Sequence, residues 1–191
     1  MKKAMTIISI GLLFILSGCI PSVHPLYTEQ DLIFDPLLVG EWVDKDGKET
    51  WTFTKSAEKT YTLRYIDEKG KTGDFVVHLL QVGDQRFLDL YPAAPDLPQN
   101  AFYGVHLLPV HTFMRVQQQG DGLQMAFLKP NWIKPYLQEH PDAIKHETGD
   151  EGILLTAQPR ELQAFLIKHD KTPEAWGECR PITRRVEKPK P

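Results

Sequence analysis

The histidines and carboxylates of this chain are the residues that could perform acid–base or metal chemistry. His106 and His111 are a candidate metal pair, but residues five apart in one strand point to opposite faces, and Pro109 interrupts this segment. His140 and His146 lie on either side of a proline without the i,i+4 spacing of a helical metal site, so a solvated loop accounts for them. The sequence therefore predicts no metal site and no cofactor.

Nucleophiles are also scarce. Ser22 and Ser56 are the only serines after residue 19, and the sequence has no Gly-x-Ser-x-Gly and no phosphate-binding glycine loop. Asp44, Asp46 and Gly47 are typical of the start of a calcium loop, but the later ligands do not follow and a hairpin turn explains these residues. We predict no catalytic residue and a non-enzymatic protein. The alternative is a hydrolase that uses dispersed carboxylates or histidines.

The first 19 residues have the layout of an export signal. Two lysines near the start precede a mostly apolar stretch over residues 5–16, and small residues follow before Cys19. The stretch is too short for a spanning helix, which needs roughly 20 apolar residues. We predict a signal peptide of residues 1–18, cleaved between Gly18 and Cys19.

The run Leu16-Ser17-Gly18-Cys19 resembles the lipobox of bacterial lipoproteins. The resemblance implies a diacylglycerol on the Cys19 sulfur and, after cleavage, an acyl chain such as palmitate on the new amine. One acyl chain binds a membrane only marginally, whereas three make a durable anchor. In enterobacterial lipoproteins an aspartate after the cysteine favours the inner membrane. Ile20 stands there, so the resemblance indicates the outer membrane, with the protein facing the periplasm.

Removal of the signal leaves 173 residues, which suits one domain with a sizeable core. It also leaves 20 basic and 25 acidic residues, a net charge of −5. Because no basic run is interleaved with aromatic residues, we expect no nucleic-acid partner. Cys179 is the one cysteine besides Cys19, so an acylated Cys19 would leave no internal disulfide and the fold must rest on its core.

The segment from Cys19 to Asp35 reads as a lipidated tether. Prolines punctuate it and it lacks sustained periodicity. The 15 residues up to Phe34 could reach about 50 Å at most, at roughly 3.3 Å each. Apolar residues such as Leu26 and Leu32 make it less polar than a free linker, so we expect part of it to pack on the domain.

The chain from residue 36 to residue 179 is predicted to form one β-domain. Short alternating segments are bounded by turn signals, of which Asp46-Gly47 is the strongest hairpin signal. We expect a mainly β fold, an antiparallel up-and-down barrel of about eight strands or a sandwich, with two short helices. The eight expected strands are residues 42–43, 49–54, 60–65, 75–80, 86–91, 110–117, 123–128 and 152–156.

Two helices are predicted near residues 131–140 and 158–169. Asn131 is a candidate N-cap of the first, and apolar residues at i, i+3, i+4 and i+7 give the second a stripe that can lie on the barrel or close its end. The basic, proline-rich residues 180–191 are predicted to be a disordered tail.

Gly40-Glu41-Trp42, after a short turn, resembles the Gly-x-Trp motif of lipocalins and the wider calycin group. The resemblance implies that Gly40 and Trp42 begin the first strand and that the tryptophan plugs the closed end of the barrel. These proteins also have a closing arginine that stacks on the tryptophan; no residue is identified for it, and Arg115 is a candidate substitute. His24-Pro25-Leu26-Tyr27 resembles a group of envelope lipoproteins that brings no activity with it.

A barrel of eight strands is either filled by side chains or holds one small ligand, and we favour the filled case. If a ligand binds, the expected lining is aromatic, with an inward imidazole from His78; the candidates are Trp51, Phe53, Tyr61, Tyr65, Phe75 and His78. We therefore predict an envelope lipoprotein that acts as an interaction or structural module with a protein partner. The alternative is a lipocalin-like carrier of an apolar small molecule.

Overall fold

The computed structural model describes residues 19–93, 104, 106–149 and 152–185. The predicted signal peptide, residues 1–18, lies outside the described residues, as do residues 186–191 of the predicted tail.

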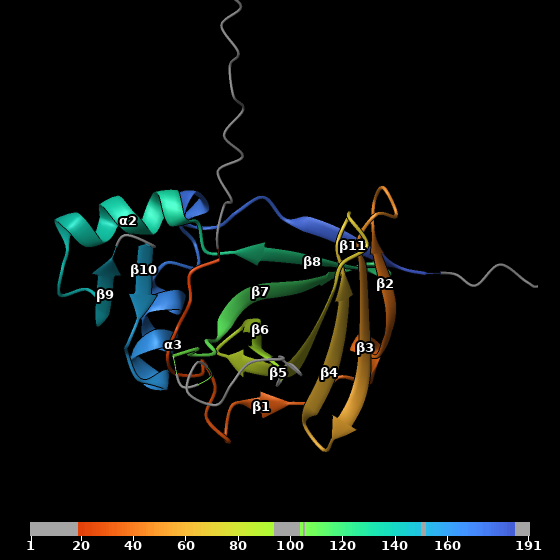
Figure 1. Cartoon of the computed structure of the whole chain (residues 1–191). Helices are drawn as coiled ribbons and strands as arrows, with labels where there is room; N and C mark the ends of the chain where they lie inside the picture. Colours follow the sequence, from red (N-terminus) through yellow and green to blue (C-terminus); the bar gives the residue numbers. More distant parts are fainter. Residues whose placement is uncertain (1–18, 94–103, 105, 150–151, 186–191) are drawn as a thin grey trace, which may run out of the picture.

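The fold is mainly β, with a closed antiparallel barrel of eight strands, as predicted (Figure 1). The strands follow one another around the barrel in chain order, and β5 pairs with β6 to keep the ring continuous while β11 joins β8 to β2. The barrel strands are β2 (Gly40–Asp44), β3 (Thr50–Ala57), β4 (Thr60–Ile66), β5 (Thr72–Val82), β6 (Gln85–Pro92), β7 (Thr112–Gln119), β8 (Gly122–Phe127) and β11 (Arg180–Arg184).

Alternation along these strands sends one set of side chains into the barrel. The interior is a single apolar cluster to which every barrel strand contributes. Its buried members are Trp42, Trp51, Phe53, Tyr61, Leu63, Val77, Leu79, Leu88, Leu90, Met114, Val116, Leu123, Met125 and Ile182, with Leu38 from the 3-10 helix η1 (Pro36–Leu38). Side chains therefore fill the interior, which is the case we favoured.

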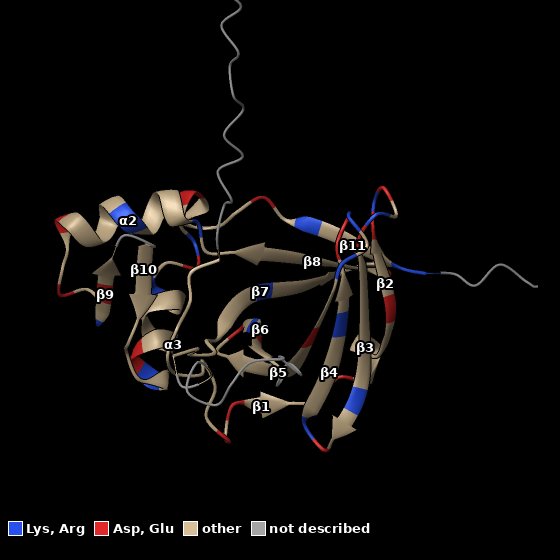
Figure 2. Cartoon of the chain, in the orientation of Figure 1, with Lys and Arg blue, Asp and Glu red and all other residues tan. Residues whose placement is uncertain are grey.

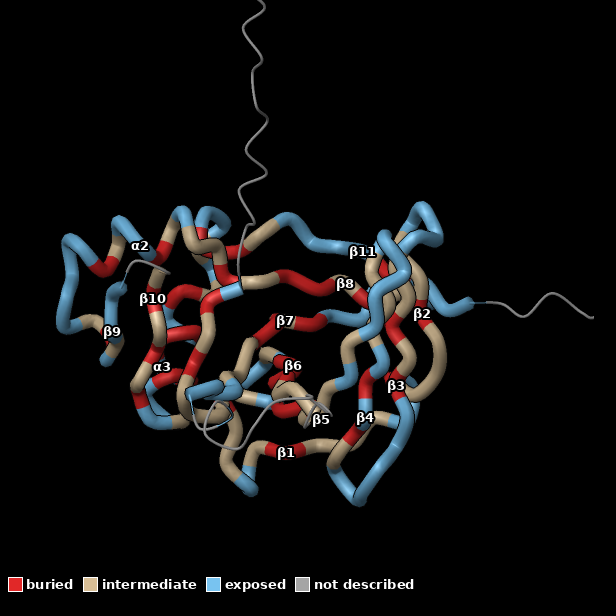
Figure 3. Tube along the Cα trace, viewed as in Figure 1, coloured by how far each residue is buried: buried red, intermediate tan, exposed pale blue. Residues whose placement is uncertain are grey.

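A second core lies outside the barrel. The outward side chains of β5 to β8, among them Leu80, Phe87 and Phe113, pack against a layer made by α2, α3 and a small hairpin. These elements are α2 (Pro130–Glu139), β9 (His146–Gly149), β10 (Gly152–Leu155), α3 (Pro159–Lys168) and the 3-10 helix η2 (Pro173–Ala175). Figure 3 shows buried positions along β7, β8 and α3, while α2 is exposed on its outer side. Four strands are thus apolar on both faces.

The helices begin close to the predicted positions, but the cap of α2 differs. Lys129 is the N-cap of α2 and no side chain bonds there, so the prediction that Asn131 caps this helix is wrong; Pro130 at the first turn sets the start. In α3 a capping box joins Gln158 and Glu161. The backbone amide of Gln158 donates to the Glu161 carboxylate at 3.0 Å.

The eighth barrel strand is not the predicted one. Gly152–Leu155 (β10) pairs with β9 and not with the barrel, and Arg180–Arg184 (β11), expected to be disordered, pairs with both β2 and β8. Only Ile182 of β11 is buried, so the segment shows almost no alternation of apolar residues. Its place is fixed by two neighbours that are distant in sequence.

The N-terminal segment packs between the barrel and the helical layer instead of leaving the domain. β1 (Leu32–Ile33) pairs with β5 at Leu79 and Leu80. Closer to Cys19, Ser22 forms bridges with both His111 and Leu155. The expectation that part of this segment packs on the domain therefore understates its contacts, because it connects the two cores.

Candidate functional site

One end of the barrel is closed by η1 and the residues that hold it. The Trp42 indole Nε1 donates to the carbonyl oxygen of Leu38 at 2.9 Å. The Arg184 guanidinium lies over the Trp42 ring, 4.7 Å from its centre, and donates to the carbonyl oxygens of Leu37 and, at 3.0 Å, Val39. A cation over an indole contributes about 0.5–2 kcal/mol, depending on its exposure. These contacts join the start of the barrel to its last strand.

Gly40 is favoured at this plug chiefly by its backbone conformation, and less by the contact that a Cβ would make with the flexible end of Arg184. Its φ is +135°, which L side chains rarely adopt, and a Cβ there would lie 2.6 Å from Nη1 of Arg184. Arg184 is thus the arginine that stacks on Trp42. Arg115, the candidate from the sequence, lies instead over Trp176 at 4.6 Å on the outside of the barrel.

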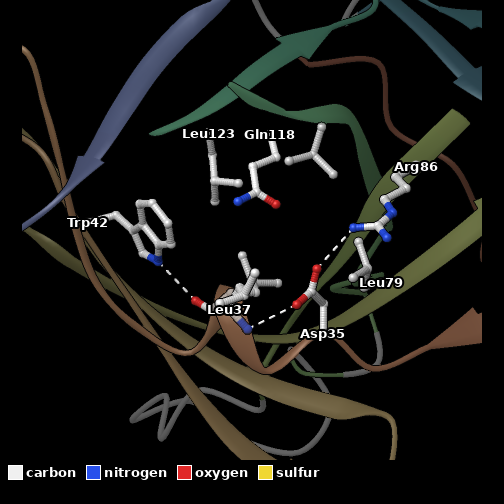
Figure 4. Close-up of a pocket in the computed structure, with 9 residues that line it drawn as sticks. Asp35, Leu37, Trp42, Leu79, Arg86, Gln118 and Leu123 are labelled. Atoms are coloured by element: carbon white, nitrogen blue, oxygen red, sulfur yellow. Dashed lines mark hydrogen bonds and ion pairs between the residues drawn. The ribbon is translucent and has the colours of Figure 1, made fainter. Parts of the chain in front are cut away.

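A small cavity of about 30 Å³ lies beneath the plug (Figure 4). At its edge the Asp35 carboxylate accepts from Arg86 at 2.9 Å and from the Leu37 amide at 2.9 Å. Apolar side chains form most of the remaining lining: Leu37, Leu38, Trp42, Leu79, Val116 and Leu123, together with Gln118. The volume is about that of one water molecule in the liquid, far below the ~300 Å³ of small-molecule sites.

The predicted aromatic ligand residues lie inside the barrel, where they pack against one another. Trp51, Phe53 and Tyr61 are buried, and Tyr65 and Phe75 are partly buried at the edge of the same cluster. The Tyr61 hydroxyl accepts from the backbone amide of Asp35 at 2.7 Å and donates to its carbonyl oxygen at 3.1 Å, so this phenol holds the plug segment.

One interior donor differs from the rest. The Trp51 indole Nε1 is buried and has no hydrogen-bond acceptor among the residues that the structure describes. Its ring lies 4.5 Å from that of Tyr65, whose pKa is raised by burial and by the nearby Glu49 carboxylate. Arg180 lies 3.9 Å from Glu49. These four side chains lie together at the barrel end opposite the plug.

His78 does not point into the barrel, so the prediction of an inward imidazole is wrong. Its neighbours Val77 and Leu79 face the interior, and His78 lies on the outer face against the ring of Tyr27 at 4.3 Å. Its Nε2 is 3.4 Å from Thr60 Oγ1. Burial lowers the pKa of His78.

Opposite His78 on the next strand, Asp89 is fully buried on the outer face. One carboxylate oxygen accepts from the Leu26 amide at 2.6 Å, and the other lies 2.7 Å from Nδ1 of His111. The pair has the Asp–His geometry of an acid–base dyad, but the nearby hydroxyl of Ser22 donates to a backbone carbonyl and is itself buried. The arrangement fastens the N-terminal segment. A charged residue within an otherwise apolar run of β6, between Leu88 and Leu90, was the signal that could have revealed Asp89.

No protein-family model, curated protein or solved structure matches this chain.

A broad surface groove of about 730 Å³ lies between α3 and the chain from Pro141 to Glu147. Charges of both signs line it, including Lys145, which pairs with Glu161 at 3.3 Å. Figure 2 shows the same mixture elsewhere, with acidic and basic positions interspersed over the barrel and the helices. The groove therefore has no single charge that would select a ligand.

Neither a metal centre nor a spanning helix is found in the part of the chain that the structure describes. No three His, Cys, Asp or Glu side chains there are arranged to hold a metal ion, and His111 is bonded to Asp89. No helix there is long and apolar enough to cross a bilayer. Cys19 and Cys179 are both exposed.

Proposed function

We propose that this chain is a lipid-anchored protein of the bacterial envelope whose barrel serves as a rigid interaction module and not as a carrier or an enzyme. The observation that carries the proposal is the filled barrel interior, in which side chains occupy the space that a carrier would keep for its ligand. Gly40, Trp42 and Arg184 support a calycin-like plug, and that plug closes the barrel without creating a site.

The anchor is supported by the lipobox and by the exposed position of Cys19. Mass spectrometry of the protein extracted from membranes should find the N-terminal Cys19 peptide with a diacylglycerol and a further acyl chain. Cys19→Ala should abolish both modifications. Density-gradient separation of the membranes should place the native protein in the outer-membrane fraction. An unmodified Cys19 in the membrane-extracted protein would overturn the anchor.

The interaction role is testable with photo-crosslinking side chains placed at exposed apolar positions. Leu108 is 66% exposed and Leu37 is 55% exposed, which makes them the natural probes. Lys134, exposed on α2 away from the plug, is the polar control. We expect a discrete crosslinked product with one envelope protein from an apolar position and none from Lys134. If neither apolar position yields a reproducible product in intact cells, the module proposal fails.

The second candidate, a carrier of an apolar small molecule, is favoured by one observation, the buried Trp51 N–H that has no acceptor among the described residues. A buried donor left unpaired costs about 1–3 kcal/mol, and the polar end of a ligand would remove that cost. Native mass spectrometry of the protein purified from membranes and displacement of a fluorescent fatty acid decide the matter. A retained small molecule that Trp51→Phe releases would favour the carrier over the module.

A further inference from the structure

Cys19 is separated from the folded body by a single peptide link. Ile20 is only 8% exposed and belongs to the outer core. The carbonyl oxygen of Pro21 accepts from the Leu155 amide at 2.9 Å. Ser22 exchanges two backbone hydrogen bonds with His111, at 2.9 and 2.8 Å. The chain is therefore fixed from the residue that follows the cysteine.

The fixed stretch continues to the buried carboxylate described above. The Val23 amide donates to the Leu155 carbonyl at 2.9 Å, and the Leu26 amide donates to Asp89 at 2.6 Å. The Gln163 side chain of α3 then donates to the Leu26 carbonyl at 2.8 Å. The free reach of the anchor falls from the ~50 Å allowed by sequence to about 3.5 Å, the span of one residue.

The cysteine also has a defined position on the barrel. Ser22 bonds to His111, which directly precedes β7, whereas Val116 and Gln118 near the other end of β7 line the cavity beneath the plug. β11 runs from Arg180 to Arg184, and Arg184 stacks on the plug residue Trp42. The first described residues therefore lie at the barrel end opposite the plug, and Figure 1 shows them beside the end of β8, away from the β3–β4 turn.

We propose that the lipid on Cys19 holds the barrel directly against the bilayer, with the Arg180 end of β11 facing the lipid headgroups and the plug pointing away. This rests on the proposed lipidation of Cys19. An anchor with no spacer restricts tilt, because the acyl chains must enter the membrane within one residue of a packed surface. The module would then present its plugged end, including the exposed Leu37, to partners away from the membrane.

The chemistry at the membrane-facing end fits a phosphate-bearing headgroup. The Arg180 side chain is 65% exposed, and its 3.9 Å contact with Glu49 is a surface ion pair worth about 0–1 kcal/mol. A headgroup phosphate can accept from the same guanidinium in bidentate fashion. Lipid phosphates therefore compete well for Arg180 once the anchor brings them close.

Full-length lipidated protein in vesicles of phosphatidylcholine and phosphatidylglycerol provides the test. Cys179, exposed and next to Arg180, is the one free thiol once Cys19 is acylated, and it takes a fluorophore. The matched control combines Cys179→Ala with Lys59→Cys, which moves the fluorophore to the β3–β4 turn. An eight-residue strand such as β3 spans about 26 Å, so the two sites differ greatly in height above the membrane.

Lipids that carry a nitroxide quencher on the headgroup should quench the Cys179 label several-fold more strongly than the label at position 59. A spacer of about 10 Gly and Ser residues between Cys19 and Ile20 allows a mean reach of about 17 Å and should bring the two quenching ratios together. Equal quenching at the two positions in the native chain, with Cys19 acylation verified by mass, overturns the orientation alone. An unmodified Cys19 overturns both proposals.

Discussion

Replacement of the buried carboxylate at Asp89 by alanine should be among the most destabilising single changes in this protein. The side chain is fully buried, with 2.6 Å to the Leu26 amide and 2.7 Å to Nδ1 of His111. Asp89→Ala leaves the amide unpaired in a buried site, at about 1–3 kcal/mol. It also removes the partner of the largely buried His111 imidazole, which leaves a second group unpaired at a similar cost. We expect a loss of about 4 kcal/mol.

Urea unfolding of residues 19–191, followed by tryptophan fluorescence, measures the loss. With an m-value of about 2.5 kcal/mol/M, the midpoint should fall by about 1.6 M. Hydrogen exchange adds a local readout. The Leu26 amide should lose its protection in the variant, while the amides of the barrel strands should lose only the protection expected from the lower global stability.

Two further variants separate the carboxylate from generic effects. Glu68→Ala, at an exposed turn position, should change stability by less than about 0.5 kcal/mol. His111→Phe combined with Asp89→Ala should cost less than the sum of the single changes, because both remove the same contact. A loss below about 1 kcal/mol for Asp89→Ala, or additive costs in the double variant, would refute the argument that this pair fastens the N-terminal segment.

Three other outcomes follow from the structure. Gly40→Ala should cost about 1–3 kcal/mol in urea unfolding, mainly from backbone strain at a φ of +135°. Arg184→Ala in the same chain should recover only the small part that comes from the contact with Arg184, and recovery of the whole cost would contradict the argument from φ. Val116→Ile adds one methylene to the wall of the ~30 Å³ cavity and should stabilise the protein by about 0.8 kcal/mol. Thermal unfolding measures this gain, and a net loss of stability would show that the cavity cannot accept the methylene. Burial lowers the pKa of His78 below its usual 6.5. As the pH falls, the unfolded chain therefore takes up the proton at His78 before the folded chain does. The stability contributed by neutral His78 is complete above pH 6.5 and declines as the pH falls toward the lowered pKa of the folded state. His78→Gln should flatten that decline in a series of urea midpoints, and an equally steep series would count against it.

The sequence by itself indicated a mainly β fold, a barrel or a sandwich, and two of the plug residues, Gly40 and Trp42. Strands β3 and β4 alternate aromatic or aliphatic residues with polar ones, and Asp46-Gly47 marks the hairpin, so local periodicity predicts these elements. Gly40 and Trp42 lie two positions apart, so their motif can be recognised in the sequence without knowledge of distant contacts. The interior aromatic residues of these two strands followed from the same alternation.

Only the tertiary structure decided which faces, strands and charges come together. β5 to β8 are apolar on both faces because helices cover the outer one, so periodicity alone could not tell that His78 and Asp89 point outward. β11 has a single buried residue, and its pairing energy comes from strands that precede it by more than fifty residues.

The N-terminal segment shows the same limit most clearly. Its prolines and weak periodicity are those of a linker, yet its backbone groups bond to His111 just before β7, to Leu155 of β10 and to the carboxylate of Asp89. Backbone hydrogen bonds between segments far apart in sequence leave no pattern in the side chains of either segment. The sequence alone therefore predicts a lipid on Cys19, while the distance from Cys19 to the domain is set only by the folded chain.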